Sequence, residues 1–539
     1  MNHKKYLILL IILMGSNLFA QNNSIDVQHY RFGISLNDTT NIVNGNATIN
    51  LKIKKAANRV YFDLEGFNDS TGNGMKVTQV SENGKELKFS QDIDRINIYF
   101  TNRLRLNESK NITIIYSGVP PDGLIIDTNK FARRTFFADN WPNRAHNWIP
   151  CNDHPSDKAS VEFMVTAPDH YRVIANGILI KESNLPNHLK LTHWKEDMVL
   201  PTKVMVIGVA DFAVQLAATI NDIPVTSWVF PENRDSGFSQ YAIAKNILPF
   251  FINYIGPYPY KKLANVQSKT IFGGMENASN IFYYQNSVKM DSVTHEDNIK
   301  LEGLFAHEEA HQWFGDEASE TDWQHVWLSE GFATYMTHMY FENTYGEDTL
   351  RSRMRVDRNK IIDFYKKRKT PVVDTNSMNN PLELLNVNSY QKGGWVLHIL
   401  RRKIGDSLFH KGIKTYYKKY QGKNASTKDF IEIMEQVSNQ KLDAFAKQWL
   451  YTAGHPMLKA TWHYDQNKKV IVMKIEQLQE DAFVFPLEIG LLVNGKFILR
   501  QISINNRTQV ITIPTPSKPQ SIQLDPQVNL LFESTLSEE

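Results

Sequence analysis

The pattern His-Glu-Glu-Ala-His at residues 307–311 constrains this chain more than any other feature of its sequence. Residues four apart lie on one face of an α-helix, so a helix here sets the imidazoles of His307 and His311 side by side. Two imidazoles at that spacing can bind one zinc ion, and Glu308 beside them can reach a water on that ion. Taken alone, the pattern also fits two ordinary histidines on an amphipathic helix, because so short a motif arises by chance.

A candidate third ligand follows at Glu330, with 18 residues between it and His311. It lies in Trp327–Ala333, which continues as a second helix, and residues 315–324 form a loop that lets the two helices pack together. A catalytic zinc takes three protein ligands and keeps its fourth position open for water. We therefore predict one Zn²⁺ held by His307, His311 and Glu330, although a glutamate taken alone is more often a solvated helix carboxylate.

The composition is that of a globular protein, and the 539 residues suffice for about two to four domains. Hydrophobic residues make up 42% and charged residues 22%, which excludes disordered, collagen-like and coiled-coil classes for most of the chain. The formal net charge is only +3, so nothing favours nucleic acid or anionic lipid as a main partner. The single cysteine, Cys151, excludes an internal disulfide framework and a cysteine-based zinc cluster.

Residues 1–20 have the layout of a secretory signal peptide. Lys4 and Lys5 precede an apolar run over residues 6–14, and small or neutral residues follow as far as Ala20. The run is shorter than the roughly 20 apolar residues that a spanning helix needs. We expect cleavage near Ala20 and an exported protein, periplasmic or extracellular, with no membrane span in the mature chain.

The hydrophobic period changes twice along the chain. Residues 21–212 alternate with period two, as over 30–36 and 47–53, and Asn44-Gly45 between these runs predicts a hairpin turn. Residues 213–453 are mainly helical in period, with Ser426 and Asp429 as a capping pair and Gly405 as a helix stop. Residues 454–539 return to strands. We predict a multidomain α+β protein with a β-sandwich domain at each end of a mainly helical domain.

Three motifs in this order resemble the gluzincin zinc aminopeptidases, the aminopeptidase N family to which leukotriene-A hydrolase also belongs. They are GGMEN at 273–277, HEEAHQWFGD at 307–316 followed by WLSEGFATYM at 327–336, and YQKG at 390–393. The resemblance implies a β-sandwich, a thermolysin-like catalytic domain and a small β-sandwich. That family often adds a large helical domain that roofs the active site. This chain stops before such a domain, which leaves the shape of the substrate chamber open.

The resemblance also implies a role for each motif. Glu308 becomes the general base and then general acid, and the hydroxyl of Tyr390 stabilises the negative charge that develops on the attacked carbonyl oxygen. Glu276 binds the free α-amine of the substrate. The residues expected to contact the peptide are Gly273, Gly274, Met275, Glu276 and Asn277. These roles predict a secreted, zinc-dependent aminopeptidase that acts on peptides with a free N-terminal amine.

Some positions depart from the family pattern or have no settled role. The family often has a Glu or Gln near Asp139 and Asn140 that helps to hold the amine, and Asp139 fits equally well as a turn residue. Glu309 stands where the family usually has an apolar residue, and we expect it to point away from the zinc. The residues that could orient the ligands are Asp316, Asn277 and Asp322.

Other functions remain open on the sequence. A thermolysin-like endopeptidase would use the same zinc chemistry on internal bonds, although Glu276 argues against it. A non-catalytic peptide-binding protein on the same scaffold is a second alternative, and the epoxide hydrolase activity of one family branch is a third without positive support. The sequence specifies neither the preferred N-terminal residue nor the oligomeric state.

Overall fold

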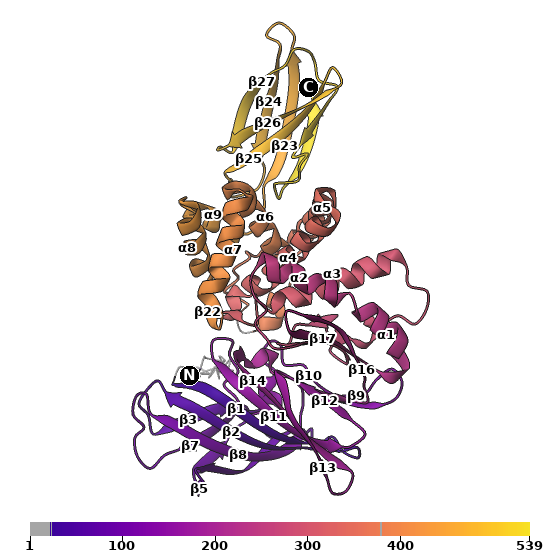
Figure 1. The fold of residues 1–539 in the computed structure, drawn as a ribbon. Helices are drawn as coiled ribbons and strands as arrows, with labels where there is room; N and C mark the ends of the chain where they lie inside the picture. Colours follow the sequence, from indigo (N-terminus) through magenta and orange to yellow (C-terminus); the bar gives the residue numbers. More distant parts are fainter. Residues whose placement is uncertain (1–21, 23, 378–379) are drawn as a thin grey trace, which may run out of the picture.

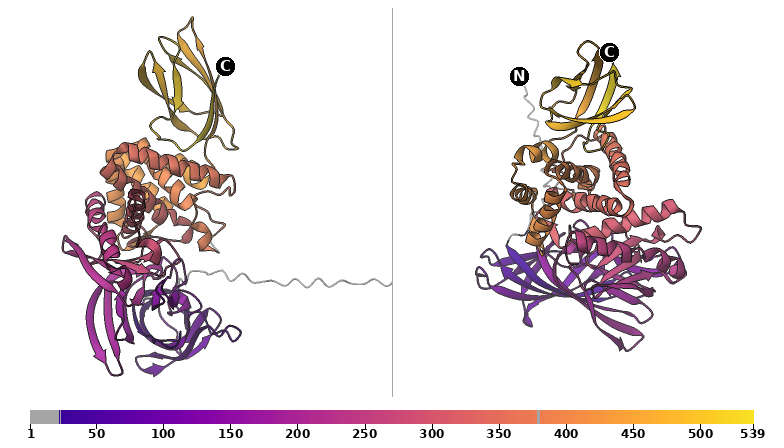
Figure 2. Two further views of the ribbon diagram at one scale, coloured as in Figure 1. Left: turned by 90° about the vertical axis from the view of Figure 1, so that its right-hand side faces the viewer. Right: turned by 45° about the horizontal axis from the view of Figure 1, so that its top comes forward.

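The structure is a computed structural model that describes residues 22, 24–377 and 380–539. The predicted signal peptide, 1–20, lies outside the described residues. Strands build the N-terminal part at one end of the molecule, helices fill the middle, and a second strand-rich part forms the opposite end (Figures 1 and 2). This arrangement confirms the predicted fold class. Among the described residues, no helix combines the length and apolar character that crossing a bilayer requires.

The N-terminal part is built on an eight-stranded sheet with a smaller four-stranded and a three-stranded sheet beside it. Strand β1 pairs with β2 and with β11, and its alternate residues Tyr30, Phe32 and Ile34 are buried, as period two predicts. The strands are β1 Ile25–Ser35, β2 Val43–Ile53, β3 Arg59–Asp63, β4 Gly74–Glu82, β5 Lys85–Glu86, β6 Lys88–Gln91, β7 Arg95–Tyr99, β8 Ser109–Val119, β9 Leu124–Thr128, β10 Arg134–Ala138, β11 Lys158–Pro168, β12 Arg172–Ala175, β13 Ile178–Leu185, β14 Leu189–Pro201 and β15 Ile207–Ala210.

The first hairpin exists, but its predicted turn is wrong. Asn44 and Gly45 lie inside β2, opposite Ser35 and Ile34 of β1, and residues 36–42 make the connection. Gly45 is needed for packing instead, because a Cβ there would come within 2.1 Å of the Tyr116 ring.

A five-stranded sheet joins the N-terminal part to the helices. Its order is β16-β17-β18-β20-β19, and the short edge strand β19 runs antiparallel to β20. The strands of the middle region are β16 Ala213–Ile220, β17 Ile223–Val229, β18 Leu263–Ser268, β19 Gly274–Met275, β20 Asn280–Tyr284, β21 Ala318–Glu320 and β22 Lys423–Ala425. Because β19 carries two of the GGMEN residues, this motif lies at the open edge of the sheet.

The helices follow the expected pattern at several ends. A capping box between Ser426 and Asp429 begins α8, and Gly405, with a positive φ of 89°, follows the last residue of α6. The helices are α1 Arg234–Tyr241, α2 Ala244–Tyr254, α3 His295–His311, α4 Trp327–Tyr345, α5 Glu347–Tyr365, α6 Gly393–Ile404, α7 Asp406–Tyr420, α8 Thr427–Ser438 and α9 Asp443–Ala446. Short helical turns include η2 Thr202–Val204, η5 Trp323–His325, η6 Pro381–Leu384 and the π-helix η7 Asn388–Lys392.

Helix α4 is the centre of the middle region and contacts α3, α5 and α6. Residues 327–341 are all buried. Where α4 crosses α6, a Cβ on Gly331 would lie 2.9 Å from the Cα of Gly393. Two glycines therefore let the helix backbones touch, and this contact brings Glu330 close to η7.

The C-terminal part consists of two sheets, in the orders β27-β24-β23-β29 and β26-β25-β28. It docks on the helices through Arg358 of α5, whose guanidinium pairs with Asp525 at 2.5 Å and donates to the Leu530 carbonyl oxygen. The strands are β23 Met457–Asp465, β24 Val470–Gln477, β25 Phe485–Val493, β26 Lys496–Ile504, β27 Thr508–Pro514, β28 Ser521–Leu524 and β29 Glu533–Glu538. The predicted domain boundaries at 212 and 453 stay predictions.

Candidate zinc site and substrate cavity

Helices α3 and α4 bring the three predicted ligands together. The Nε2 atoms of His307 and His311 are 3.2 Å apart, and Oε2 of Glu330 lies 3.4 Å from the first and 3.2 Å from the second. Ligand atoms around a tetrahedral zinc, with bonds of 2.0–2.1 Å, are about 3.3 Å apart. The three atoms therefore stand at the spacing that one zinc ion requires.

The donor chemistry also fits a cation. The Nδ1 atom of His311 lies 3.1 Å from the carbonyl oxygen of Phe314, so its N–H is donated there and Nε2 faces the other two ligands. Burial alone would lower the pKa of His311, but the carboxylates of Glu330 and Glu276 raise it to about 10. At neutral pH a proton therefore occupies this cluster, and a bound Zn²⁺ would displace it and supply the positive charge that the buried carboxylates favour.

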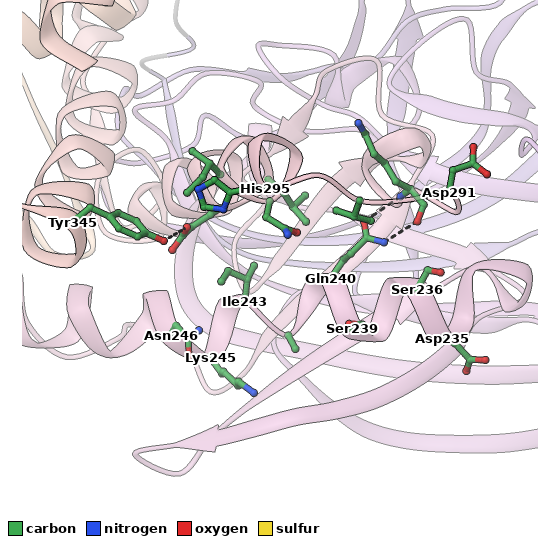
Figure 3. A pocket seen from close by; sticks show the side chains of 17 residues that line it. Asp235, Ser236, Ser239, Gln240, Ile243, Lys245, Asn246, Asp291, His295 and Tyr345 are labelled. Carbon is green, nitrogen blue, oxygen red and sulfur yellow. Dashed lines mark hydrogen bonds between the residues drawn. The ribbon is translucent and has the colours of Figure 1, made fainter. Parts of the chain in front are cut away.

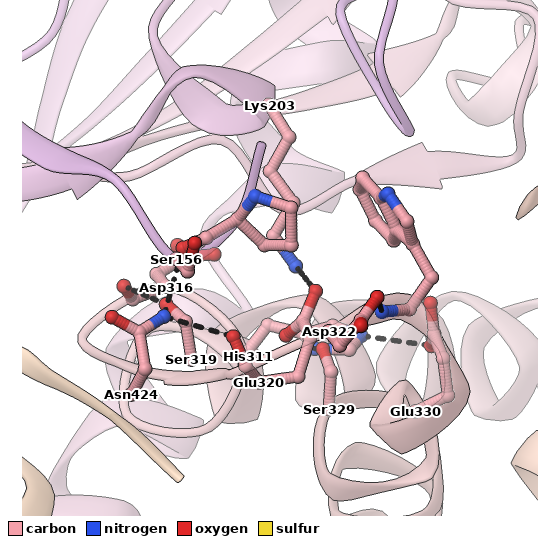
Figure 4. A network of polar contacts seen from close by, with 12 residues as sticks. Ser156, Lys203, His311, Asp316, Ser319, Glu320, Asp322, Ser329, Glu330 and Asn424 are labelled. Atoms are coloured by element: carbon pink, nitrogen blue, oxygen red, sulfur yellow. Dashed lines mark hydrogen bonds and ion pairs between the residues drawn. The ribbon is translucent and has the colours of Figure 1, made fainter. Parts of the chain in front are cut away.

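A serine that the sequence analysis did not single out contacts the second histidine. Ser329 Oγ lies 3.0 Å from Nδ1 of His311, so the residue next to Glu330 on α4 also orients a ligand on α3 (Figure 4). The side chains of the three residues expected to orient the ligands have other partners or, within the described chain, none. Asp316 accepts a hydrogen bond from Gln312, and Asp322 caps η5. Both side-chain polar atoms of Asn277 lack a hydrogen bond within the described chain. The packing of α4 on α3 decides this, and no sequence motif marks it.

One cavity of about 290 Å³ collects nearly every predicted site residue. Asn277 is the exception, because it is fully buried and does not line the cavity. The lining residues are Trp141, Phe272, Gly273, Gly274, Met275, Glu276, Leu304, His307, Glu308, His311, Glu330, Leu385 and Tyr390. The three motifs thus meet in space in one cavity.

Glu308 lies between the zinc ligands and the GGMEN edge strand. A Cβ added to Gly274 would come within 2.3 Å of its Oε1 atom, so the glycine makes room for the carboxylate. Burial raises the pKa of Glu308 well above its usual value, and the nearby carboxylates of Glu276 and Glu330 add to this. A carboxylate with a raised pKa holds a transferred proton more readily, which suits a general base.

Glu276 presents an unsatisfied carboxylate to the cavity. Its side chain is only 5% exposed, and Oε1 has no hydrogen-bond partner within the described chain. Its backbone oxygen accepts a 2.6 Å hydrogen bond from Gln312, which follows His311 directly and fixes this segment to the end of the zinc helix. Burial raises the pKa of Glu276 and Glu330 adds to this, whereas His311 and Lys203 oppose it. A substrate ammonium would satisfy the unpaired oxygen.

Tyr390 closes the cavity from η7. Its ring stacks on the imidazole of His307 with 5.9 Å between ring centroids and 15° between planes. Burial, and then the carboxylates of Glu330 and Glu276, raise the pKa of its hydroxyl well above 10. The phenol therefore stays protonated and remains a hydrogen-bond donor at neutral pH.

Asp139 and Asn140 are not available to a substrate amine. Asp139 pairs with Arg144 at 2.9 Å and accepts from the backbone N–H of Ile271, while Asn140 donates to the carbonyl oxygen of Met205 at 2.6 Å. Both side chains are fully buried, and neither lines the cavity. Trp141, the next residue, lines it instead, and nothing in the sequence distinguished this tryptophan from a core residue.

Glu309 does not line the cavity, in keeping with its expected direction. It is fully buried, and neither carboxylate oxygen has a hydrogen-bond partner within the described chain. Burial raises the pKa of Glu309 well above its usual value.

A larger cavity, of about 740 Å³, lies between α1, α2 and the first turns of α3 (Figure 3). It contains none of the predicted site residues. His295, which lines it, begins α3, whereas His311 ends the helix about 24 Å further along its axis. Among its polar groups, the side-chain amide of Gln240 donates to the Lys289 carbonyl oxygen at 2.8 Å.

A His, His and Glu site on two packed helices, beside a sheet edge that carries an unpaired glutamate, is the arrangement of a metallopeptidase. Comparison with protein families makes the assignment specific. Residues 26–204 match the peptidase M1 N-terminal domain, and residues 240–449 match the peptidase family M1 domain. The chain belongs to peptidase family M1, which confirms the resemblance found in the sequence.

Known relatives are longer than this chain. Leucyl aminopeptidase of Saccharolobus solfataricus is 24% identical over 460 residues, which cover 81% of this chain and 56% of that protein. Glutamyl aminopeptidase of Sus scrofa is 27% identical over 60% of this chain and 35% of that protein. The fold is similar to Legionella pneumophila aminopeptidase A in complex with aspartic acid, with a TM-score of 0.80 and 17% identity over 95% of this chain and 60% of that one.

Proposed function

We propose that this protein is a zinc-dependent aminopeptidase that hydrolyses the first peptide bond of peptides with a free N-terminal amine. One observation carries the proposal: the unpaired carboxylate of Glu276 shares a cavity of about 290 Å³ with Glu308 and the three zinc ligands. An α-ammonium on Glu276 sets the first carbonyl near the metal site. An internal peptide segment brings no such charge and would leave the buried acid unpaired, which is costly.

The residues have separate tasks in this reaction. When bound, zinc supplies a Lewis acid and lowers the pKa of a bound water from 15.7 to about 7. Glu308 takes a proton from the attacking water and passes it to the leaving amine. The Tyr390 hydroxyl donates a hydrogen bond to the carbonyl oxygen as negative charge develops there, and such a donor is typically worth about 3–4 kcal/mol.

Release of single amino acids from matched free and N-acetylated peptides tests the proposal. We expect release only from the free peptide, its loss with a zinc chelator and its return with added zinc. Cleavage of the acetylated peptide at an internal bond would favour the endopeptidase. Peptide binding without turnover by the zinc-loaded protein would favour the non-catalytic alternative.

We further propose that the protein is exported, periplasmic or extracellular, because residues 1–20 have the layout of a signal peptide. N-terminal sequencing of the protein from fractionated cells tests this. A start near residue 21 in the periplasm or medium would support export, and an intact Met1 in the cytoplasm would contradict it.

A further inference from the structure

Apolar side chains from separate parts of the chain form a wall of the substrate cavity. Trp141 follows β10, Phe272 precedes the GGMEN edge strand, and Leu385 lies between η6 and η7. Trp141 is 2% exposed, while Phe272 and Leu385 are half-buried and pack on the core beneath them. Apart from the Nε1–H of Trp141, which has no hydrogen-bond partner within the described chain, the wall presents apolar surface to whatever occupies the cavity.

Two neighbouring side chains hold Trp141 in place. Its ring packs edge-on against Trp323, with ring centroids 5.5 Å apart. The ammonium of Lys203 lies 5.8 Å from the ring centroid and is paired with Glu320 at 2.6 Å. The tryptophan is thus a preformed surface and not a mobile side chain, so it can discriminate between substrates at little entropic cost.

The cavity is lined by acidic side chains and by no lysine or arginine among the described residues. The three carboxylates are those of Glu276, Glu308 and Glu330. Lys203 is fully buried and engaged by Glu320. An acidic side chain would therefore enter beside like charges, and no lysine or arginine among the described lining residues would pair with it. A basic side chain would meet the apolar wall, because each carboxylate already has a task in the proposed reaction.

Only one residue of the substrate fits between the amine at Glu276 and the carbonyl at the zinc ligands, so its side chain has to lie in this cavity. We propose that Trp141, Phe272 and Leu385 select peptides whose first residue is apolar, of the leucine, methionine or phenylalanine kind, and disfavour an acidic one. This inference rests on the proposed aminopeptidase function. The proposed preference for an apolar first residue differs from the preference that the name glutamyl aminopeptidase gives for some relatives of this chain.

Aminoacyl fluorogenic substrates carrying Leu, Met, Phe, Glu, Asp, Lys or Arg test the proposal on the zinc-loaded full chain. We expect kcat/KM for Leu to exceed that for Glu by about 100-fold or more, since even one methylene in an apolar pocket is worth about 10–200-fold. A value for Glu equal to or above that for Leu would overturn the proposal.

Two matched arginine variants test whether the apolar wall causes the discrimination between Leu and Glu substrates. Leu385→Arg places a cation in the wall and is expected to raise the Glu-to-Leu ratio of kcat/KM at least tenfold. Leu382→Arg adds the same charge three residues away, at a side chain that is 45% exposed and outside the cavity, and is expected to leave the ratio unchanged. An unchanged ratio in the folded Leu385 variant, or an equal shift in both variants, would overturn the assignment of the wall.

The affinities of leucine hydroxamate and aspartate hydroxamate, measured by calorimetry, test the apolar cavity independently of any peptide hydrolysis. Tighter binding of the leucine compound by at least tenfold supports the apolar cavity even if no peptide is hydrolysed, and the proposed function alone would then fail. Equal or reversed affinities overturn the inference even if peptides with free amines are hydrolysed.

Discussion

Glu308 is assigned to proton transfer because His307, His311 and Glu330 already stand at the spacing of one zinc ion, while the carboxylates of Glu308 and Glu276 also lie within 4.8 Å of His311 and of each other. The change Glu308→Gln keeps the size of the side chain and removes its basicity. We expect zinc content to stay at one ion per chain while kcat falls about 10²–10⁴-fold, the usual contribution of a general base. Metal analysis alongside steady-state kinetics checks this. Near-normal turnover would remove Glu308 from its assigned role.

Glu276 governs recognition of the free amine in the same cavity. We expect Glu276→Gln to raise KM for free-amine substrates and to narrow the difference in kcat/KM between free and acetylated peptides, because the neutral amide no longer attracts an ammonium. Glu309→Gln is the control, since that glutamate is equally buried but does not line the cavity. A change of preference in the Glu309 variant, or none in the Glu276 variant, would contradict the assignment.

Individual residues differ in how far the sequence predicts their place. His307, Glu308 and His311 follow from the helical period, which fixes their spacing without reference to any other part of the chain. Glu276 and Tyr390 became candidates through family resemblance, since only the tertiary fold brings residues 276 and 390 to the zinc helix. Trp141 could not be predicted, because a tryptophan in a sequence is usually a core residue.

The crossing of α4 and α6 gives a prediction at the scale of elements. A methyl group in Gly331→Ala would meet the backbone of Gly393 at 2.9 Å, where neither backbone can easily yield. We expect a loss of about 1–3 kcal/mol in stability, together with weaker zinc binding, because the helix that carries Glu330 must shift. Thermal unfolding and zinc titration measure the two effects.

Gly303→Ala on α3 is the matched control for that variant. The nearest atom to its added Cβ is 3.7 Å away, an ordinary contact, and alanine favours a helix by up to about 1 kcal/mol. We therefore expect unchanged or slightly higher stability there. Equal losses in both variants would mean that the glycine contact between α4 and α6 is not special.

Asp157, directly before β11, makes the stability of the N-terminal sheets depend on pH. Its carboxylate accepts from Asn152 and from the backbone of Val27 on β1, yet burial raises its pKa from 3.8 to about 7. The folded state then binds the extra proton, so this stabilisation is complete below about pH 4 and is lost as the pH rises through 7. Between pH 5 and 7 the loss is about 2–3 kcal/mol.

Asp157→Asn should remove that slope, because the amide does not titrate. We expect the stability difference between variant and parent, from urea unfolding, to change by about 2 kcal/mol in favour of the variant from pH 5 to pH 7. Asp69→Asn, at an exposed loop position in the same part of the chain, should leave the pH profile unaltered. Parallel profiles for the parent and the Asp157 variant would show that this carboxyl does not titrate in that range.

Helix ends were predictable where a local interaction defines them, as the capping box at Ser426 and the stop at Gly405 show. The turn of the first hairpin could not be predicted. An Asn-Gly pair is common in turns, but the same pair can lie inside a strand where the glycine makes room for a tyrosine ring, as Gly45 does here. The π-helix η7, which carries Tyr390, depends on packing against α4 and lacks a local signal.

At the scale of the molecule, the order of strand-rich, helical and strand-rich parts could be predicted from hydrophobic periods, but the contacts between the parts could not. The N-terminal part contacts the zinc region through two lysines, of which Lys158 is half-buried and Lys203 is buried. Lys158 donates to the carbonyl oxygens of Glu317 and Lys423, and Lys203 pairs with Glu320 beside Trp141. Buried lysines are rare, and sequence alone does not indicate which surface lysine will lie in such an interface.

The Lys203–Glu320 pair therefore tests whether the interface between the parts supports the site. Both side chains are almost fully buried, and Lys203→Met leaves the Glu320 carboxylate without its charge partner. We expect a loss of about 3–5 kcal/mol in urea unfolding. The double variant Lys203→Met with Glu320→Gln should recover much of it, because the uncompensated charge is gone. If the single and double variants lost equal stability, the pair would contribute through side-chain packing and not through its charge.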